Sequence, residues 1–346
     1  MLLYLQLISD PEMFKMVDSG IRGGVAMVVN RFARANNKYL GDLYDPSKPT
    51  TFILYLDANN LYGWAMSQPL PIRGFKWLTR AEINAIDWKA QTVEQKFGYI
   101  LEVDMKYPAA LHDRHNEFPL AVERLSLSME MLSETQLKVR SQYKMSRSGK
   151  DSKLVPNLMD KTKYVVHYRN LQFYLQQGLI LKKVHRVICF EQEPWVAPYI
   201  AKNQQLRAAA TSEFERDQYK LFNNAIYGKM VENQKKRTDI RLLTDWSACK
   251  KLIEKPNCRG FRVFGENLAA VELQKVNGLI NKPFEDGFTV LDISKLVMDE
   301  YLFMTIFCCS ALFLLIKFVY LSTLKSERIL SIPSAFHDPR INFEIN

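Results

Sequence analysis

The chain has 346 residues, a length that suffices for two or three domains. Its composition, 47% hydrophobic and 24% charged residues, excludes a disordered chain. Its 47 Lys and Arg against 37 Asp and Glu give a formal net charge of +10, which favours a polyanionic partner such as nucleic acid or an anionic membrane surface. The five cysteines form no Cys-x-x-Cys pair and no secretory signal pattern is present, so we expect reduced thiols in an intracellular protein.

The first fifty residues contain the motif Ile21-Arg22-Gly23-Gly24 ahead of another apolar stretch. Paired glycines allow the backbone to approach a ligand closely, or allow two elements to cross tightly. From these residues alone, a ligand contact and a structural turn are equally good interpretations.

A short buried strand is predicted at residues 51–56, which are apolar and rich in β-branched and aromatic side chains. Asp57 ends the strand, and the Asn-Asn-x-x-Gly sequence after it favours a tight turn. A carboxylate at such a strand end can hold Mg²⁺, whose remaining positions take water or phosphate oxygens. Tyr62 would then lie beside whatever binds the metal. Taken alone, the segment is also typical of an ordinary strand-to-turn connection.

A second strand is predicted at residues 98–105, where alternation places Glu102 and Asp104 on the same side. Further metal ligands for the Asp57 site and a solvated strand face are the two interpretations of this pair, and we favour the solvated face. A third core strand is predicted at residues 182–190.

A basic stretch separates these two strands. Residues 137–169 contain nine Lys or Arg against two Asp, with a flexible loop predicted at 146–152. Basic residues interleaved with Tyr143, Tyr164 and Tyr168 are typical of a surface that follows phosphates and stacks bases. A solvated, lysine-rich loop is the alternative.

Two antiparallel helices are predicted next, near residues 195–210 and 212–235. On the second, Lys220, Asn224 and Tyr227 are spaced i, i+4 and i+7 and therefore project from one face. Two cations (Arg216 lies one turn earlier), an amide and an aromatic ring suit a nucleoside triphosphate with a stacked base. A solvated basic face is the alternative.

Together, Asp57-x3-Leu-Tyr62 and Lys220-x3-Asn224-x2-Tyr227-Gly228 resemble motifs A and B of the family B DNA polymerases. The sequence of residues 57–66 is most similar to the protein-primed, viral and organellar branch, which includes copies carried by large DNA transposons. The resemblance runs from about residue 9 to about residue 299. It implies an α/β (α+β) fold, with a partial polymerase palm sheet, helical fingers, no exonuclease domain, and an incomplete palm and thumb.

The resemblance divides the chain into five segments. In order they are a pre-palm segment with the Ile-Arg-Gly-Gly motif, a palm with motif A and a basic insertion, a fingers helix pair with motif B, a partial palm, and an apolar segment with a non-homologous tail (residues 1–50, 51–194, 195–236, 237–301 and 302–346).

The resemblance also implies roles for single residues. Two Mg²⁺ ions are expected, with Asp57 and the carbonyl of Ala58 as ligands, and Tyr62 would exclude the 2′-hydroxyl of a ribonucleotide. The triphosphate would contact Arg207, Arg216 and Lys220, while Asn224 and Tyr227 would shape the nascent base pair. Contacts to DNA are implied for Arg22, Gly23, Gly24, Gly228, Lys144 and Arg147. The partners would be primer-template DNA, deoxynucleoside triphosphates and a terminal protein primer. The compartment stays open between a nuclear, an organellar or other intracellular setting and, if residues 302–321 span a bilayer, a membrane.

The pattern breaks after residue 299, where the family would present the Asp-Thr-Asp-Ser motif that supplies a second metal carboxylate. The sequence contains no such tetrapeptide. Instead, residues 302–321 carry a single charge, Lys317, and reach the length of about 20 residues that a membrane span needs. A buried helix and a membrane span are two interpretations; we favour a third, in which the coding sequence departs from its ancestral frame near Asp299.

A two-metal reaction needs two bridging carboxylates, so we expect an impaired DNA-directed DNA polymerase. The alternatives are a non-catalytic nucleic-acid-binding remnant and a membrane-tethered protein.

Overall fold

The computed structural model describes residues 4–25, 32, 34–58, 60–144, 152–233, 238–274, 281–308, 314–316 and 341–345. For residues 53–57 and those after 303, the description covers the backbone only. The chain divides into two compact units. Unit 1 comprises residues 1–227 and 285–346, and unit 2 comprises residues 228–284.

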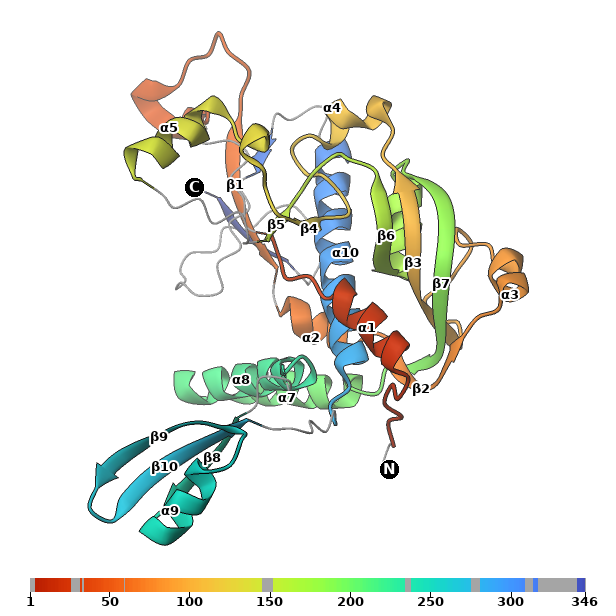
Figure 1. Ribbon diagram of the computed structural model, residues 1–346. Helices are drawn as coiled ribbons and strands as arrows, with labels where there is room; N and C mark the ends of the chain where they lie inside the picture. The colour runs from red at the N-terminus through yellow and green to blue at the C-terminus, as the bar shows by residue number, and fades with distance from the viewer. Residues whose placement is uncertain are drawn as a thin grey trace. The chain divides into compact units, whose positions relative to one another are not determined.

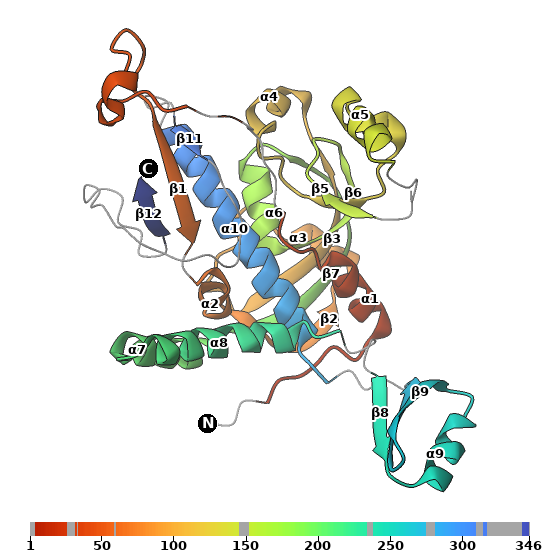
Figure 2. The same ribbon diagram turned by 90° about the vertical axis from the view of Figure 1, so that its left-hand side faces the viewer.

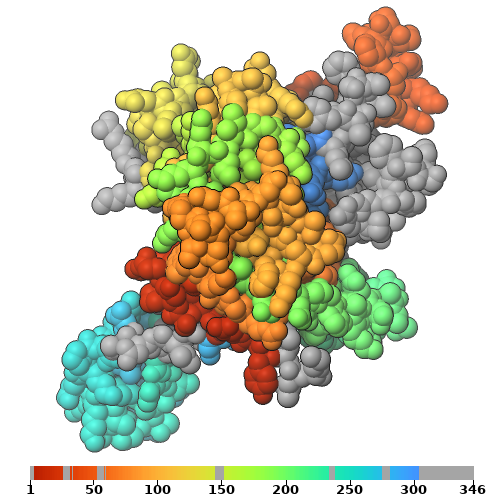
Figure 3. All heavy atoms as spheres, turned by 90° about the vertical axis from the view of Figure 1, so that its right-hand side faces the viewer, coloured from red at the N-terminus to blue at the C-terminus, as the bar shows by residue number. Residues whose placement is uncertain are grey.

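An antiparallel four-stranded sheet of order β2-β7-β3-β6 lies at the centre of unit 1 (Figure 1). Its strands are β2 (Leu70–Trp77), β3 (Phe97–Lys106), β6 (Lys161–His167) and β7 (Ile180–Glu193). The predicted strands at residues 98–105 and 182–190 are confirmed as β3 and β7, the central pair. Figure 3 shows the side of unit 1 that carries β7 and the short helix α3 (Arg80–Ala85).

Two helices cover one face of this sheet, α6 (Tyr168–Gln176) and α10 (Phe284–Cys308) (Figure 2). Leu101 and Val103 of β3 share one core cluster with Leu171 of α6 and Leu296 of α10. Because alternate residues of a strand face the same side, the apolar positions of β3 dictate which face the helices bury.

The N-terminal helix α1 (Pro11–Gly20) packs onto the same assembly. Its start is fixed by the Asp10 carboxylate, which accepts hydrogen bonds from the backbone N–H groups of Glu12 and Met13 at 2.7 and 3.3 Å. A Cβ on Gly20 would lie 2.7 Å from Phe288 of α10 and from Val165 of β6. Only glycine therefore lets the end of α1 approach both elements so closely.

A second, three-stranded sheet has the order β11-β1-β12. The predicted strand at residues 51–56 is confirmed as its centre, β1 (Phe52–Ala58), which pairs parallel with β11 (Leu314–Ile316) and antiparallel with β12 (Ile341–Ile345). Figures 1 and 2 both place α10 between β1 and the four-stranded sheet.

Two longer helices follow β7 and confirm the predicted pair. They are α7 (Ala197–Ala209) and α8 (Glu213–Met230). The remaining elements of unit 1 are short: η1 (Lys38–Leu43), α2 (Leu61–Met66), η2 (Ala109–Leu111), α4 (His112–His115), β4 (Glu123–Leu125), η3 (Met129–Met131), α5 (Glu134–Gln142) and β5 (Lys153–Val155).

In the residues of unit 2 that the structure describes after the end of α8, a helix packs on a three-stranded antiparallel sheet of order β8-β10-β9. Its elements are β8 (Thr238–Leu243), α9 (Trp246–Ile253), β9 (Cys258–Gly265) and β10 (Leu268–Gln274). Cys249 of α9 packs with Ala269, Val271 and Leu273 of β10, which alternate along the strand and thus share one face.

The predicted apolar segment at residues 302–321 begins inside α10. Leu302 and Phe303 are buried in the core of unit 1, and the Phe303 ring lies 5.0 Å from that of His115 and 5.8 Å from that of Phe173. The helix and core therefore continue past the predicted break at Asp299. In the part of the chain that the structure describes, no helix has the length and hydropathy of a membrane span. Half of the predicted segment, residues 309–313 and 317–321, lies outside that part.

The predicted basic surface at residues 137–169 is wrong in its second half. Tyr164 and Tyr168 are buried in the core, and so are unable to stack bases at a surface. Lys161 is equally buried, and its ammonium group lies 2.9 Å from the Glu123 carboxylate. These residues belong to β6, a strand of the sheet, and to α6, and the inward faces of both elements pack in one core with α10. Tyr143, at the end of α5, is 67% exposed.

Candidate functional site

The turn after β1 is built by two residues that depend on each other. Asn60 adopts left-handed backbone angles (φ 49°, ψ 43°), which asparagine tolerates better than most residues, and its carbonyl accepts the N–H of Trp64 at 2.9 Å to begin α2. The Asn60 amide lies directly over Gly63, where any Cβ would collide with it. Asp57 is the next-to-last residue of β1, one residue before the strand ends, but its side chain lies outside the described residues.

Tyr62 and Tyr227 stack on each other, with ring centroids 4.4 Å apart and an interplanar angle of 10°. Tyr62 comes from α2 and Tyr227 from α8, so this contact brings together two motifs that lie far apart in the sequence. Burial, and to a lesser degree the neighbouring Tyr62, raises the pKa of Tyr227 above its ordinary value. Its hydroxyl therefore stays protonated throughout the physiological range. In Figures 1 and 2, α2 lies between the end of β1 and the α7–α8 pair.

Three predicted residues form an exposed row on α8, Arg216, Lys220 and Asn224, here called the α8 stripe. Their i, i+4, i+8 spacing keeps them on one helix face, one turn apart. Arg207, on α7, is also exposed. Among the described residues, no ion pair engages Arg207, Arg216 or Lys220. The cations are thus available to an anion.

A buried amide pair holds α7 and α8 together. The side-chain N–H of Asn203 donates to the side-chain oxygen of Asn223 at 2.8 Å, and the two residues are only 5% and 4% exposed. Such a pair favours one register of the two helices, because a shift leaves both amides buried without partners. The sequence analysis missed this pair. Its signal in the sequence is the double Asn223-Asn224, of which the first residue is buried and the second exposed.

Arg22, one of the residues predicted to contact DNA, is largely buried inside unit 1. Its guanidinium donates to the carbonyl of Val165 at 2.8 Å and lies 3.8 Å from the centre of the Tyr164 ring. With 8% of the residue exposed, little of it remains for the predicted template contact. Gly23 and Gly24 are exposed, and a Cβ on Gly23 would meet nothing within 4 Å.

The other residues predicted to contact DNA give a mixed result. Lys144 is exposed just after α5, with a positive φ of 47°. Gly228 is exposed, and a Cβ there would meet nothing within 4 Å. Arg147 lies outside the described residues. Nothing in these surroundings tests a role in DNA binding.

The predicted metal site has no visible ligand set. Among the described side chains, no three His, Cys, Asp or Glu lie close enough together to hold an ion. Asp57 and the Ala58 carbonyl therefore stay predicted ligands. Glu102 and Asp104 are otherwise engaged: the Glu102 carboxylate accepts two hydrogen bonds from Arg186, and Asp104 lies 2.8 Å from His185.

Behind this site, α10 carries charges that the sequence analysis did not single out. The Asp292 carboxylate accepts the backbone N–H of His167 at 2.9 Å and lies 3.7 Å from the ammonium of Lys295. Burial raises the pKa of Asp299, one helical turn beyond Lys295, to about 7. We call Arg22, Asp292, Lys295 and Asp299 the α10 charge cluster. Its contacts are internal to the fold, which indicates a structural role.

Comparison with known proteins adds a family. The sequence model of the type B DNA polymerases of organelles and viruses matches residues 8–275. No curated protein matches the chain.

The solved structures that match the chain include several of Phi29 DNA polymerase. The ternary complex with primer-template DNA and incoming nucleotides is 15% identical, with a TM-score of 0.42, over 83% of this chain and 39% of that one. An orthorhombic crystal form is 13% identical, with a TM-score of 0.44, over 88% of this chain and 42% of that one. The complex with single-stranded DNA is 16% identical, with a TM-score of 0.40, over 84% and 39%. The chain thus spans about two fifths of the length of these structures.

Proposed function

Because this chain belongs to the type B DNA polymerases of organelles and viruses, we propose that it carries the nucleotide-binding part of a template-directed DNA polymerase. In this proposal, Arg207, Arg216 and Lys220 bind the triphosphate of an incoming deoxynucleotide. Asn224 and Tyr227 shape the nascent base pair. The partners are primer-template DNA and, by analogy with the protein-primed branch, a terminal protein.

The observation that carries the proposal is the stacked pair Tyr62–Tyr227. It places the turn after β1 beside the helix that bears the α8 stripe, as a shared nucleotide pocket requires. A triphosphate on the cations of the α8 stripe would direct its sugar towards Tyr62. A ring in that position leaves room for the C2′ hydrogen of deoxyribose and less for the hydroxyl of ribose.

We propose Mg²⁺ as the cofactor, held by Asp57 and the carbonyl of Ala58. A divalent ion, when bound, neutralises charge on the triphosphate and on the leaving group. The described residues do not contain a set of ligands for it, so no step is assigned to it. Since the sequence also carries no Asp-Thr-Asp-Ser motif, we expect incorporation by this chain alone to be weak.

Binding of dATP to the full chain tests the nucleotide pocket. Replacing Lys220 or Arg216 by Ala removes a charged hydrogen-bond donor worth about 1.5–3 kcal/mol and should weaken binding by about 10- to 150-fold. Lys202→Ala is the matched control, because Lys202 is an exposed cation on the neighbouring helix α7 outside the α8 stripe. Equal affinity in all three variants and the wild type would remove the pocket from consideration.

The alternative function is nucleic-acid binding without chemistry, favoured by the net charge of +10 and the missing motif. Metal-dependent primer extension that is lost in Asp57→Ala would support the polymerase. DNA binding with no extension, unchanged in that variant, would support the remnant.

A further inference from the structure

Unit 2 holds most of the excess positive charge of the chain. Its 57 residues contain twelve Lys or Arg against six Asp or Glu, a net charge of +6 out of +10 for the whole chain. A small basic unit of this kind attracts polyanions, since the attraction to a chain of phosphates grows with each cation supplied.

Unit 2 also leaves three aromatic side chains open to solvent. Trp246 is 49% exposed, and Phe261 and Phe264 are each 55% exposed. The reason lies in the packing: α9 lies over β10 and leaves β9, at the edge of the sheet, largely uncovered. Phe261 stands opposite the fully buried Val271 and on the same face of the sheet, yet remains open. The guanidinium of Arg262 lies 5.4 Å from the Phe264 ring.

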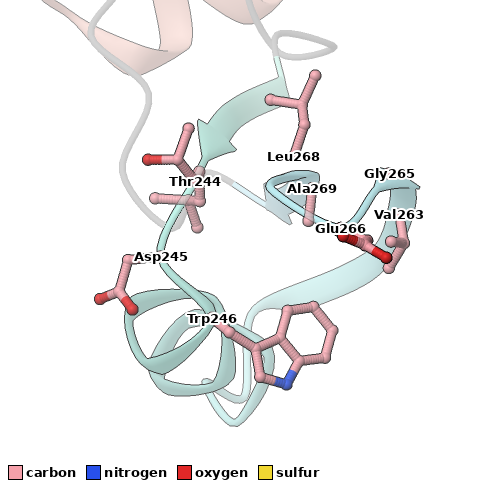
Figure 4. Close-up of a pocket in the computed structure, with 9 residues that line it drawn as sticks. Thr244, Asp245, Trp246, Val263, Gly265, Glu266, Leu268 and Ala269 are labelled. Carbon is pink, nitrogen blue, oxygen red and sulfur yellow. The ribbon is translucent and has the colours of Figure 1, made fainter.

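One of these rings lines a cavity of about 340 Å³ at the start of α9 (Figure 4). Trp246 forms one wall, and the apolar side chains of Val263, Leu268 and Ala269 line the cavity with it. Thr244, Asp245 and Glu266 add polar groups. The Asp245 carboxylate already caps α9, accepting the N–H groups of Ser247 and Ala248 at 3.0 and 3.1 Å. This cap fixes the start of α9 at Trp246.

We propose that unit 2 binds single-stranded DNA, with one unstacked base lying against Trp246 in this cavity and the basic residues of the unit neutralising the neighbouring phosphates. A flat aromatic base suits an apolar cavity with an indole wall, because stacking on an aromatic side chain is open to every base. The Glu266 carboxylate repels phosphate but accepts hydrogen bonds from the amino or imino group of a base. The base therefore enters the cavity and the backbone stays outside it.

The choice of DNA as the ligand rests on the proposed function, but the site shares no residue with the proposed nucleotide pocket. The two can therefore fail independently. A chain that lost dATP binding and kept Trp246-dependent strand binding would refute the polymerase proposal and leave this one standing.

The test uses the full chain and two fluorescently labelled strands of about 12 nucleotides, within the span of one single-strand-binding module. One is oligothymidylate and the other an abasic strand of equal length and charge. Loss of one base stack is worth about 1–3 kcal/mol, so Trp246→Ala should weaken oligothymidylate binding by about 5- to 150-fold and leave abasic binding unchanged. Trp246→Phe, which keeps a smaller ring, should fall between Trp246→Ala and the wild type.

The control variant is Ile240→Ala. Ile240 is 60% exposed and lies on the face of the sheet away from α9, because it stands opposite Glu272 and alternates with the inward positions. It should bind both strands as the wild type does. Protection of the backbone amides of β8, β9 and β10 from hydrogen exchange, measured in each variant, establishes that unit 2 is folded.

Three results would overturn the proposal. Equal loss of both strands in Trp246→Ala would assign binding to charge alone. Unchanged binding of both strands in a folded Trp246→Ala would leave the cavity without a base. Unchanged strand binding together with a shift from dimer to monomer in sedimentation would make the cavity a contact between two copies of this chain.

Discussion

The α10 charge cluster and the α8 stripe are built from the same kinds of side chain but differ in their surroundings. In the cluster, Asp292 and Arg22 are 4% and 8% exposed, and their side chains hydrogen-bond to backbone groups of β6, the N–H of His167 and the carbonyl of Val165. In the stripe, Arg216 and Lys220 are exposed, and no ion pair engages them in the described part of the chain. A charged residue is therefore a candidate for function only after its contacts within the protein are known.

The largest effect that would test this difference is expected for Asp292→Ala. The substitution leaves the buried N–H of His167 without an acceptor and Lys295 without its nearest carboxylate. These losses should lower the free energy of unfolding by about 3 kcal/mol, measured by urea denaturation. Asp292→Asn keeps an acceptor and should lose less.

Lys220→Ala is the matched exposed variant and should change the free energy of unfolding by less than about 0.5 kcal/mol. If Lys220→Ala destabilised the chain as much as Asp292→Ala, the stripe would belong to the structural charges and its assignment to a ligand would fail.

The next effect concerns pH. The pKa of Asp299 is about 7 in the folded chain, well above the ordinary value for aspartate, because burial disfavours the charge despite nearby Lys295. Between about pH 4 and pH 7 the folded chain holds a proton that the unfolded chain has released. Stability therefore falls as pH rises through this window, by at most about 1.4 kcal/mol per pH unit.

Asp299→Asn cannot ionise and should flatten this dependence. In urea denaturation at pH 5 and pH 8, the free energy of unfolding of Asp299→Asn relative to that of the wild type should be higher at pH 8 than at pH 5. Glu285, whose pKa burial also raises to about 7, contributes the same trend in both proteins and so does not disturb the comparison. Parallel curves for the two proteins would show that Asp299 is ionised in the fold.

The third effect concerns α7 and α8, where the α8 stripe is exposed but Asn223 is not. Asn203→Ala leaves the Asn223 oxygen buried without its donor and should cost about 1–3 kcal/mol in unfolding free energy. Replacing both residues by Leu should recover most of the loss, because it removes both buried polar groups. A double variant as unstable as the single one would mean that the Asn203–Asn223 pair stabilises the fold by more than the hydrogen bond between its two buried amides.

Several local features followed from the sequence with little ambiguity. The apolar run before Asp57 forms β1, and the spacing of Lys220, Asn224 and Tyr227 places them along α8. Motifs A and B were also sufficient to predict the polymerase family that the comparison shows. Each of these rests on periodicity or on turn residues within one segment.

Other features could not be read this way. Arg22 precedes two glycines, as a ligand-binding loop would have it, but a ring and a carbonyl from β6 enclose its side chain. Tyr164 and Tyr168 alternate with cations, as a base-stacking surface would, but face the core. The cavity beside Trp246 gathers residues from β8, α9, β9 and β10 that no sequence pattern links.

By itself, the sequence determined the type of most elements, the face on which neighbouring side chains lie, and the family. The tertiary structure decided which of the charged and aromatic residues are enclosed and which remain open to a ligand. The physical reason is that helical and strand periodicity are properties of neighbours in the chain. Burial, by contrast, is supplied by segments that lie far away in the sequence.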